Sequence, residues 1–153
     1  MTKLIIACAV ILLSGCATQL DGPSAFARLS PTKGNTTTGV VTFKTLGSKV
    51  WVTADIQGLK PNAEHGFHVH DKGDCSSGDG MSTGGHFNPN SQAHGAHGSN
   101  AHHAGDLPSL RADVSGNAKI SFETSSITIG SGSTDIVGRG LIVHRDPDDF
   151  QTQ

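Results

Sequence analysis

Nine histidines in a chain of 153 residues constrain the fold more than any other feature, because most lie in a stretch without strand or helix periodicity. Residues 72–107 are rich in Gly, Ser, Asn and His and have no apolar period. A loop of this length is uncommon in a compact domain unless it is functional. Bound metal can order such a loop, because ligand bonds made only in the folded state stabilise that state. The alternative is a flexible histidine-rich tract that scavenges metal.

Outside this loop the sequence predicts short β-strands. The apolar residues at 50, 52, 54 and 56 alternate with polar Thr53 and Asp55, so they share one face of a strand. Turn residues, among them many of the 20 glycines and 6 prolines, separate further runs of this kind. We expect strands at 25–29, 39–46, 49–56, 65–70, 118–124, 126–129 and 141–144. The pattern predicts an all-β fold, an antiparallel Greek-key sandwich or barrel that carries the long loop.

The N-terminus has the features of a secretory signal. Lys3 precedes a run of about ten apolar residues, which is shorter than the roughly 20 residues of a membrane-spanning helix. The segment Leu13-Ser14-Gly15-Cys16 matches a bacterial lipobox, in which Cys16 is lipidated and becomes the new N-terminus. The alternative is an ordinary signal peptide with an incidental cysteine. Because Ala17 rather than Asp follows, we predict an outer-membrane lipoprotein that faces the periplasm and is held by two or three acyl chains.

These boundaries predict a signal at 1–15, a lipidated cysteine and short linker at 16–24, and one domain at 25–153. Cys75 is then the single cysteine of the mature domain, which is unusual in an oxidising compartment. The formal net charge of −2 indicates neither nucleic acid nor an acidic membrane surface as a partner. Any membrane association is expected only through the lipid anchor.

The histidines fall into two spacings that suit metal binding. On a strand, residues two apart point the same way, so His68 and His70 present two rings to one spot. His144 ends an apolar run, where a buried structural histidine is the alternative. The loop adds further candidate ligands, among them His86, His94, His103 and Asp106. Three histidines with one carboxylate suit tetrahedral zinc, whereas histidines alone in a flatter arrangement suit copper.

Four motifs occur in the order GFHVH, GGHFNP, HxGDL and LIVH, and in this the chain resembles the copper/zinc superoxide dismutases, in particular their bacterial secreted members. The likeness covers roughly residues 25–153. The resemblance implies that copper is held by His68, His70, His86 and His144. It implies that zinc is held by His86, His94, His103 and Asp106, so that the ring of His86 bridges the two ions.

The resemblance also implies a reaction and a supporting carboxylate. Asp148 resembles the residue that links a copper-ligand histidine, here His68, to a zinc-ligand histidine, here His94. The implied activity converts superoxide to dioxygen and hydrogen peroxide, with copper changing oxidation state and His86 supplying a proton. The implied partner is superoxide, and the family allows a homodimer.

Three more histidines of this region are expected not to bind metal. His65 matches a family position that braces the backbone. The HxGDL pattern selects His103 for zinc over its neighbour His102. His97 matches no ligand and is expected to be a solvated loop residue.

The chain departs from the family after Asp148. Family members continue beyond the position of Gln153 through a Gly-rich turn, an arginine, a cysteine and a final strand, so we expect a sandwich without its last strand. Cys75 matches one half of the family disulfide, and Arg145 does not match the arginine that attracts superoxide. Two alternatives to an active dismutase therefore stay open. One is a non-enzymatic copper- and zinc-binding periplasmic lipoprotein, and the other is an inactive, truncated dismutase.

Overall fold

The computed structural model describes residues 22–152. The predicted signal at 1–15, the predicted lipidation site Cys16 and most of the predicted linker at 16–24 lie outside the described residues. Within 22–152, no helix is long and apolar enough to cross a membrane.

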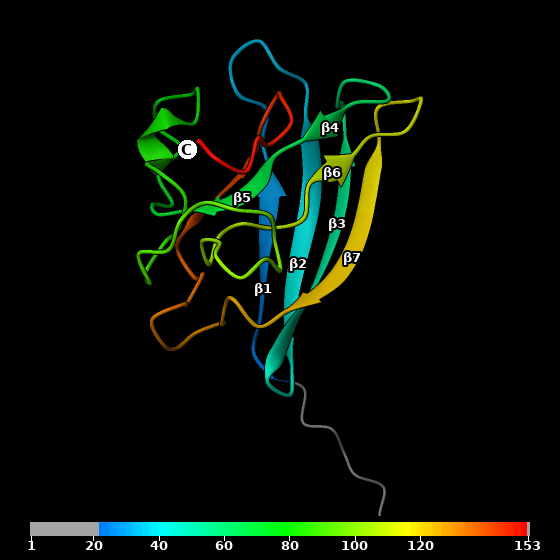
Figure 1. Cartoon of the computed structure of the whole chain (residues 1–153). Helices are drawn as coiled ribbons and strands as arrows, with labels where there is room; N and C mark the ends of the chain where they lie inside the picture. The colour runs from blue at the N-terminus through cyan, green and yellow to red at the C-terminus, as the bar shows by residue number, and fades with distance from the viewer. Residues whose placement is uncertain (1–21, 153) are drawn as a thin grey trace, which may run out of the picture.

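A curved antiparallel sheet forms one layer of the molecule, with the strand order β1-β2-β3-β7 (Figure 1). Its strands are β1 (Ser24–Leu29), β2 (Thr38–Leu46), β3 (Lys49–Gln57) and β7 (Ala118–Thr124). Leu46 pairs with Lys49 at the end of the β2–β3 hairpin. The two-residue turn between them needs a residue with positive φ, and Gly47 supplies it at 61°.

Two short antiparallel ladders face this sheet across the core. In one, β5 (Phe67–His70) pairs with β8 (Gly140–Val143). In the other, β4 (Glu64–His65) pairs with β6 (Leu110–Arg111). The long loop runs between β5 and β6, and its only regular element within the described residues is a single 3-10 turn, Met81–Thr83. Figure 1 shows this loop and the C-terminal segment together on the side of the molecule away from β7.

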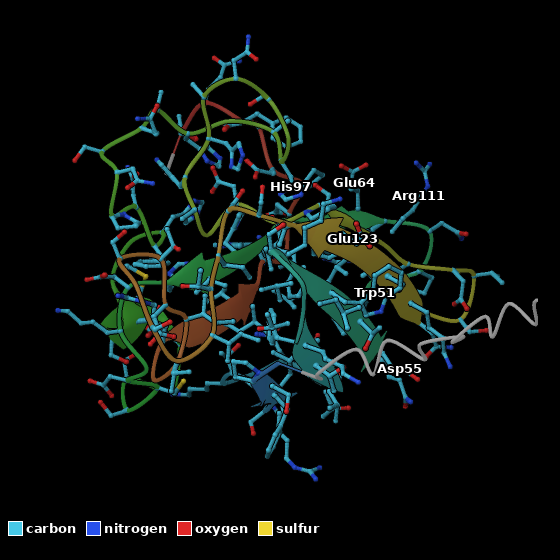
Figure 2. The ribbon with its side chains drawn as sticks, turned by 90° about the horizontal axis from the view of Figure 1, so that it is seen from below. Trp51, Asp55, Glu64, His97, Arg111 and Glu123 are labelled. Carbon is cyan, nitrogen blue, oxygen red and sulfur yellow. The ribbon has the colours of Figure 1, made fainter. Side chains whose placement is uncertain are left out.

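The core lies between the two layers and follows the alternation of β3. Val50, Val52 and Ile56 are buried, whereas Trp51 and Asp55 point outward. Figure 2 shows Trp51, Asp55 and Glu123 on the outer face of the sheet. The buried faces of both layers meet in one cluster that includes Val41, Phe43, Val52, Ile56, Phe67, Val69, Phe87 and Leu110. The loop residue Phe87 belongs to this cluster, so the loop is anchored in the core.

The predicted all-β antiparallel class is confirmed, but one predicted strand is wrong. Residues 126–129 form no strand: Thr128 makes only an isolated parallel bridge with Asp135. Ile127 and Ile129 are both buried, so the alternation that suggested a strand comes from a loop that inserts two side chains into the core. The predicted strand 65–70 is split at Gly66 into β4 and β5. β6 and the 3-10 turn were not predicted, because two or three residues carry no readable period.

The buried side chain of Ile56 gives a test of this core. Ile56 is fully buried, and Ile56→Ala should lower the free energy of unfolding by about 2–5 kcal/mol in urea titrations, because it removes buried methyl groups and leaves a cavity. Gln57, its exposed neighbour on β3, provides the matched control, since Gln57→Ala should change stability by no more than about 0.5 kcal/mol. Equal losses in the two variants would contradict the assigned register.

Candidate metal centre

Strand β5 positions the histidine cluster because it has partners along both edges. On one edge it pairs with β8, and the amide of His144 donates to the Gly66 carbonyl at 2.8 Å. On the other edge two loop segments dock by isolated bridges, His70 with His86 and His68 with Asp106. The two histidines of β5 therefore meet residues from three distant parts of the sequence.

Backbone hydrogen bonds hold the two loop segments against β5. The amide of Phe87 donates to the Val69 carbonyl at 2.8 Å, and the amide of Val69 donates to the Gly105 carbonyl at 2.9 Å. The amide of Gly105 in turn donates to the Phe87 carbonyl at 2.9 Å. A Cβ atom at 105 would strike the Val69 carbonyl, so only glycine permits this close approach. This ladder orders the loop beside the candidate ligands His86 and Asp106.

The first cluster consists of the four predicted copper ligands. One nitrogen from each of them can be chosen so that all four lie within 4.8 Å of one another: His68, His70, His86 and His144. Within residues 22–152, Nδ1 of His68 and Nε2 of His70 and His144 are buried and have no hydrogen-bond partner. Unpaired buried polar atoms cost free energy, and three of them facing one spot fit a metal ion. The site therefore fits copper by its donor chemistry.

Hydrogen bonds on the opposite ring nitrogens fix which atoms stay free. Nε2 of His68 contacts Oδ2 of Asp148 at 2.7 Å, and Nδ1 of His70 donates to the Gly84 carbonyl at 2.7 Å. The hydroxyl of the buried residue Thr83 also lies 3.2 Å from Nδ1 of His70. No pattern in the sequence indicated a role for Thr83 or Gly84, because their contacts depend on how the loop folds back over β5.

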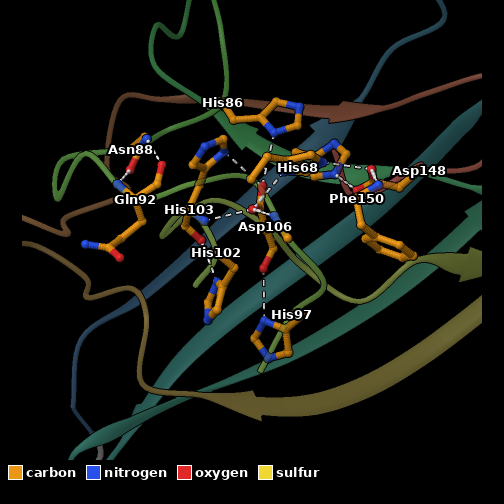
Figure 3. A network of polar contacts seen from close by, with 12 residues as sticks. His68, His86, Asn88, Gln92, His97, His102, His103, Asp106, Asp148 and Phe150 are labelled. Carbon is orange, nitrogen blue, oxygen red and sulfur yellow. Dashed lines mark hydrogen bonds and ion pairs between the residues drawn. The ribbon is translucent and has the colours of Figure 1, made fainter. Parts of the chain in front are cut away.

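The second cluster is centred on Asp106, whose side chain is only 1% exposed. Nδ1 of His86 and Nδ1 of His94 each lie 3.0 Å from a carboxylate oxygen of Asp106. Nδ1 of His103 lies 3.4 Å from Oδ1 and is buried without a hydrogen bond among the described residues. Three imidazole nitrogens and one carboxylate are a donor set that suits zinc. These are the four residues predicted to hold it, of which Figure 3 labels His86, His103 and Asp106.

Judged only by the distances between ligand atoms, His68 rather than His103 groups with His86, His94 and Asp106, because one ligand atom from each of these four lies within 4.8 Å of the others. His68 has one nitrogen bonded to Asp148, so its remaining nitrogen can serve only one ion. If the first cluster takes that nitrogen, the second retains His103, whose Nδ1 is otherwise unused. We therefore favour His103 for the second site. His86 differs, because Nδ1 faces Asp106 and Nε2 remains for the first cluster.

Asp148 connects the two clusters from the C-terminal segment. Its Oδ2 lies 2.7 Å from Nε2 of His68, and its Oδ1 lies 2.8 Å from Nε2 of His94. The amide of Phe150 donates to the same Oδ1 at 2.8 Å, which fixes the carboxylate in the segment (Figure 3). The structure thus places Asp148 between His68 and His94, the two rings that the family resemblance implies it links.

Burial and nearby charges set the protonation of these groups. Burial, reinforced by the neighbouring ring of His86, lowers the pKa of His68 to about 4, and burial likewise lowers the pKa of His70 to about 4. Burial also opposes the charged form of His94, but hydrogen bonds to Asp148 and Asp106 outweigh it and raise its pKa. Burial would raise the pKa of Asp106, yet hydrogen bonds from His86 and the His103 amide hold that pKa well below its usual range. Burial thus favours the neutral form of His68 and His70, whereas Asp106 stays ionised.

The remaining histidines lie outside the two clusters. Nδ1 of His65 donates to the His144 carbonyl at 2.9 Å, which confirms its predicted bracing contact. Nδ1 of His102 donates to the His103 carbonyl at 2.7 Å. His97 is a loop residue as expected, but it is half-buried and makes specific contacts. Its Nδ1 donates to the Asp106 carbonyl at 2.9 Å, and its half-buried ring packs against Phe122.

A cavity of about 440 Å³ opens onto the first cluster, next to His68, His86 and His144. Its lining carries one cation and three carboxylates, which are Arg145, Asp146, Asp148 and Asp149. The Arg145 side chain is 84% exposed, and its Nε lies 3.6 Å from a carboxylate oxygen of Asp146. The route to the cluster is therefore acidic. Cys75 is exposed and forms no disulfide within the described residues.

Comparisons with known proteins agree with this geometry. The sequence profile of the copper/zinc superoxide dismutase (SODC) family matches residues 37–153. The chain is 48% identical over 112 residues to a Cu-Zn superoxide dismutase of Paramecium bursaria Chlorella virus 1, covering 73% of this chain but 59% of that relative. The fold is similar to the crystal structure of the clock protein EA4, with a TM-score of 0.75, 39% identity, and coverage of 82% of this chain and 77% of that one.

The lowered histidine pKa values predict how the metal-free protein responds to acid. Between the ordinary pKa of 6.5 and about 4, the unfolded chain binds protons that folded His68 and His70 do not. Stability should therefore fall as the pH drops through this range, by about 1.4 kcal/mol for each pH unit and each such ring. The raised pKa of His94 acts in the opposite direction. It stabilises the folded state at low pH, and this contribution is lost as the pH rises through that pKa.

Urea titrations of the metal-free chain at intervals from pH 7 to 4 measure this loss. His70→Asn removes one titrating ring and retains a side-chain amide that can donate to Gly84. Its stability should depend less steeply on pH, and an unchanged slope would contradict the assignment.

Proposed function

Because the chain belongs to the copper/zinc superoxide dismutase family, we propose that it converts superoxide to dioxygen and hydrogen peroxide. The family uses copper and zinc. The observation that carries the proposal is the position of His86, which contributes to both histidine clusters. A protein that only stores metal has no need of one ring shared between two unlike sites. Copper, when bound, supplies the one-electron redox chemistry, and zinc supplies a fixed positive charge.

The residues around His86 have distinct tasks in this proposal. His68, His70, His86 and His144 would hold copper, and His86, His94, His103 and Asp106 would hold zinc. His86 keeps Nδ1 on the Asp106 side, so Nε2 is the atom that can carry a proton toward the cavity. Asp148 and the Gly84 carbonyl hold the rings of His68 and His70 in the tautomers that leave Nδ1 and Nε2 free.

A second candidate function is supported by the charge of the cavity. Superoxide is an anion, and the lining carries three carboxylates against one arginine. Such a field slows the approach of an anion, since electrostatic steering changes association rates by roughly 10- to 1000-fold. The same site could then act mainly as a copper- and zinc-binding protein without efficient turnover. The chain spans 59% of the length of the viral relative, so its activity as a whole protein is part of the proposal.

The decisive experiment measures superoxide loss by pulse radiolysis with the full chain reconstituted with one copper and one zinc. The loaded protein should speed superoxide loss in the presence of EDTA, which suppresses catalysis by free copper, and His86→Ala should lower that rate, because the shared ring and its proton are lost. Added salt should screen the lining charges, so it should narrow the difference in rate between the wild type and a variant that lacks one lining carboxylate.

Asp146→Asn provides a matched variant, since it removes one carboxylate of the lining without touching either cluster. It should increase the rate at low salt. If neither the loaded wild type nor loaded Asp146→Asn speeds superoxide loss above the uncatalysed rate in EDTA, the enzyme proposal fails and the metal-binding function remains.

The location proposed for the protein is the bacterial periplasm, with the domain anchored to the outer membrane through lipidated Cys16. The support is the lipobox Leu13-Ser14-Gly15-Cys16 in the sequence. In a bacterial host, Cys16→Ser should release the protein from the membrane fraction and remove the mass of the acyl groups. Membrane association that persists in this variant would contradict the proposal. The homodimer stays a prediction, which sedimentation would test.

A further inference from the structure

His97 and His102 form a pair of rings that neither histidine cluster uses. Their ring centroids lie 5.5 Å apart with the planes tilted by 55°. Both belong to the loop between β5 and β6, on the side of Asp106 that faces β7 (Figure 3). The family patterns found in the sequence leave both residues without a ligand role.

Backbone acceptors select the same tautomer in both rings. Nδ1 of His97 donates to the Asp106 carbonyl at 2.9 Å, and Nδ1 of His102 donates to the His103 carbonyl at 2.7 Å. A neutral imidazole that donates through Nδ1 carries its lone pair on Nε2. The hydroxyl of Ser126 lies 3.5 Å from Nε2 of His102, in position to serve as a donor to it. Figure 3 shows both rings with Nδ1 turned toward the Asp106 region and Nε2 turned away from it.

The separation of the two rings is compatible with their sharing one ion. His86 and His103, both proposed to hold zinc, also have centroids 5.5 Å apart, and His94 and His103 lie at 5.2 Å. Two imidazoles that each bind through a nitrogen at about 2.0–2.1 Å have centroids at comparable spacing. The pair is therefore close enough for one ion to contact both rings.

The surroundings hold the pair in place and leave it accessible. The ring of His97 packs edge-on against Phe122 of β7 at 5.5 Å. Both histidines are half-buried, in contrast to the fully buried His103 and Asp106 beside them. Water can therefore complete the coordination shell of an ion at this position, with the Ser126 hydroxyl close by.

From these contacts we propose that His97 and His102 form an accessory site for a late first-row divalent ion, such as Zn²⁺, bound through their Nε2 atoms. Imidazole is a preferred ligand of zinc, copper and nickel, and two such ligands with water make a weaker site than four protein ligands. The site is independent of dismutase activity, because it shares no ligand with the two main clusters. Only the main-chain carbonyls of Asp106 and His103 connect it to them.

The test begins with full chain that has been loaded with one copper and one zinc and freed of excess metal. Titration with Zn²⁺ against a chromophoric chelator, followed by metal analysis, should show one further ion per chain. His97→Asn and His102→Asn should each weaken that last step at least about tenfold, since even the loss of outer-shell contacts costs 10–100-fold. The visible spectrum of the copper should not change.

Asparagine is the informative substitution because its side-chain amide can donate to the same carbonyl but offers no Nε2. Loss of the extra ion in both variants, with the main centre fully loaded, therefore assigns the ion to this pair. Three results would overturn the proposal. They are no extra ion in the wild type, an extra ion bound equally well by both variants, and loss of the main-centre zinc in the variants, which would make the pair a brace for the loop.

Discussion

The carboxylate of Asp106 organises the loop on which both clusters depend. It accepts hydrogen bonds from Nδ1 of His86 and His94, and from the backbone amides of His103 and Gly95. The backbone of Asp106 also forms a bridge with His68 of β5. Together these contacts hold three stretches of the loop against the strand. A buried polar network of this kind imposes one arrangement when its members are satisfied. A loop without apolar periodicity thereby acquires the order that a hydrophobic face provides elsewhere.

Hydrogen-bond acceptors give the histidines of this chain different tasks despite their common chemistry. A carbonyl or carboxylate at one nitrogen of a ring determines which nitrogen remains free, as Gly84 does for His70 and Asp148 does for His68. His86 has a carboxylate on one side and the first cluster on the other, so it belongs to both sites. The hydrogen-bond acceptors therefore determine the arrangement of the centre as much as the rings do.

The parts that could be predicted from the sequence were those with a short-range signal. The alternation of β3 identified its buried face, and the spacing within His68-Val69-His70 identified two rings on one side of a strand. Residues 127 and 129 misled the prediction, because a loop that buries two isoleucines has the same alternation as a strand. The contacts of His97 and Thr83 could not be predicted, since they arise only when distant segments of the loop meet β5 and β7.

The position of Asp148 also makes the C-terminal segment part of the centre. The Asp148 carboxylate joins that segment to the ring of His68 on β5 and to the ring of His94 in the loop, and the amide of Phe150 donates to its Oδ1. Coupling of this kind is reciprocal, because whatever favours one partner must favour the other by the same free energy. A ligand that tightens the two rings would shield the segment from proteases, and an antibody that grips the segment would slow the escape of metal.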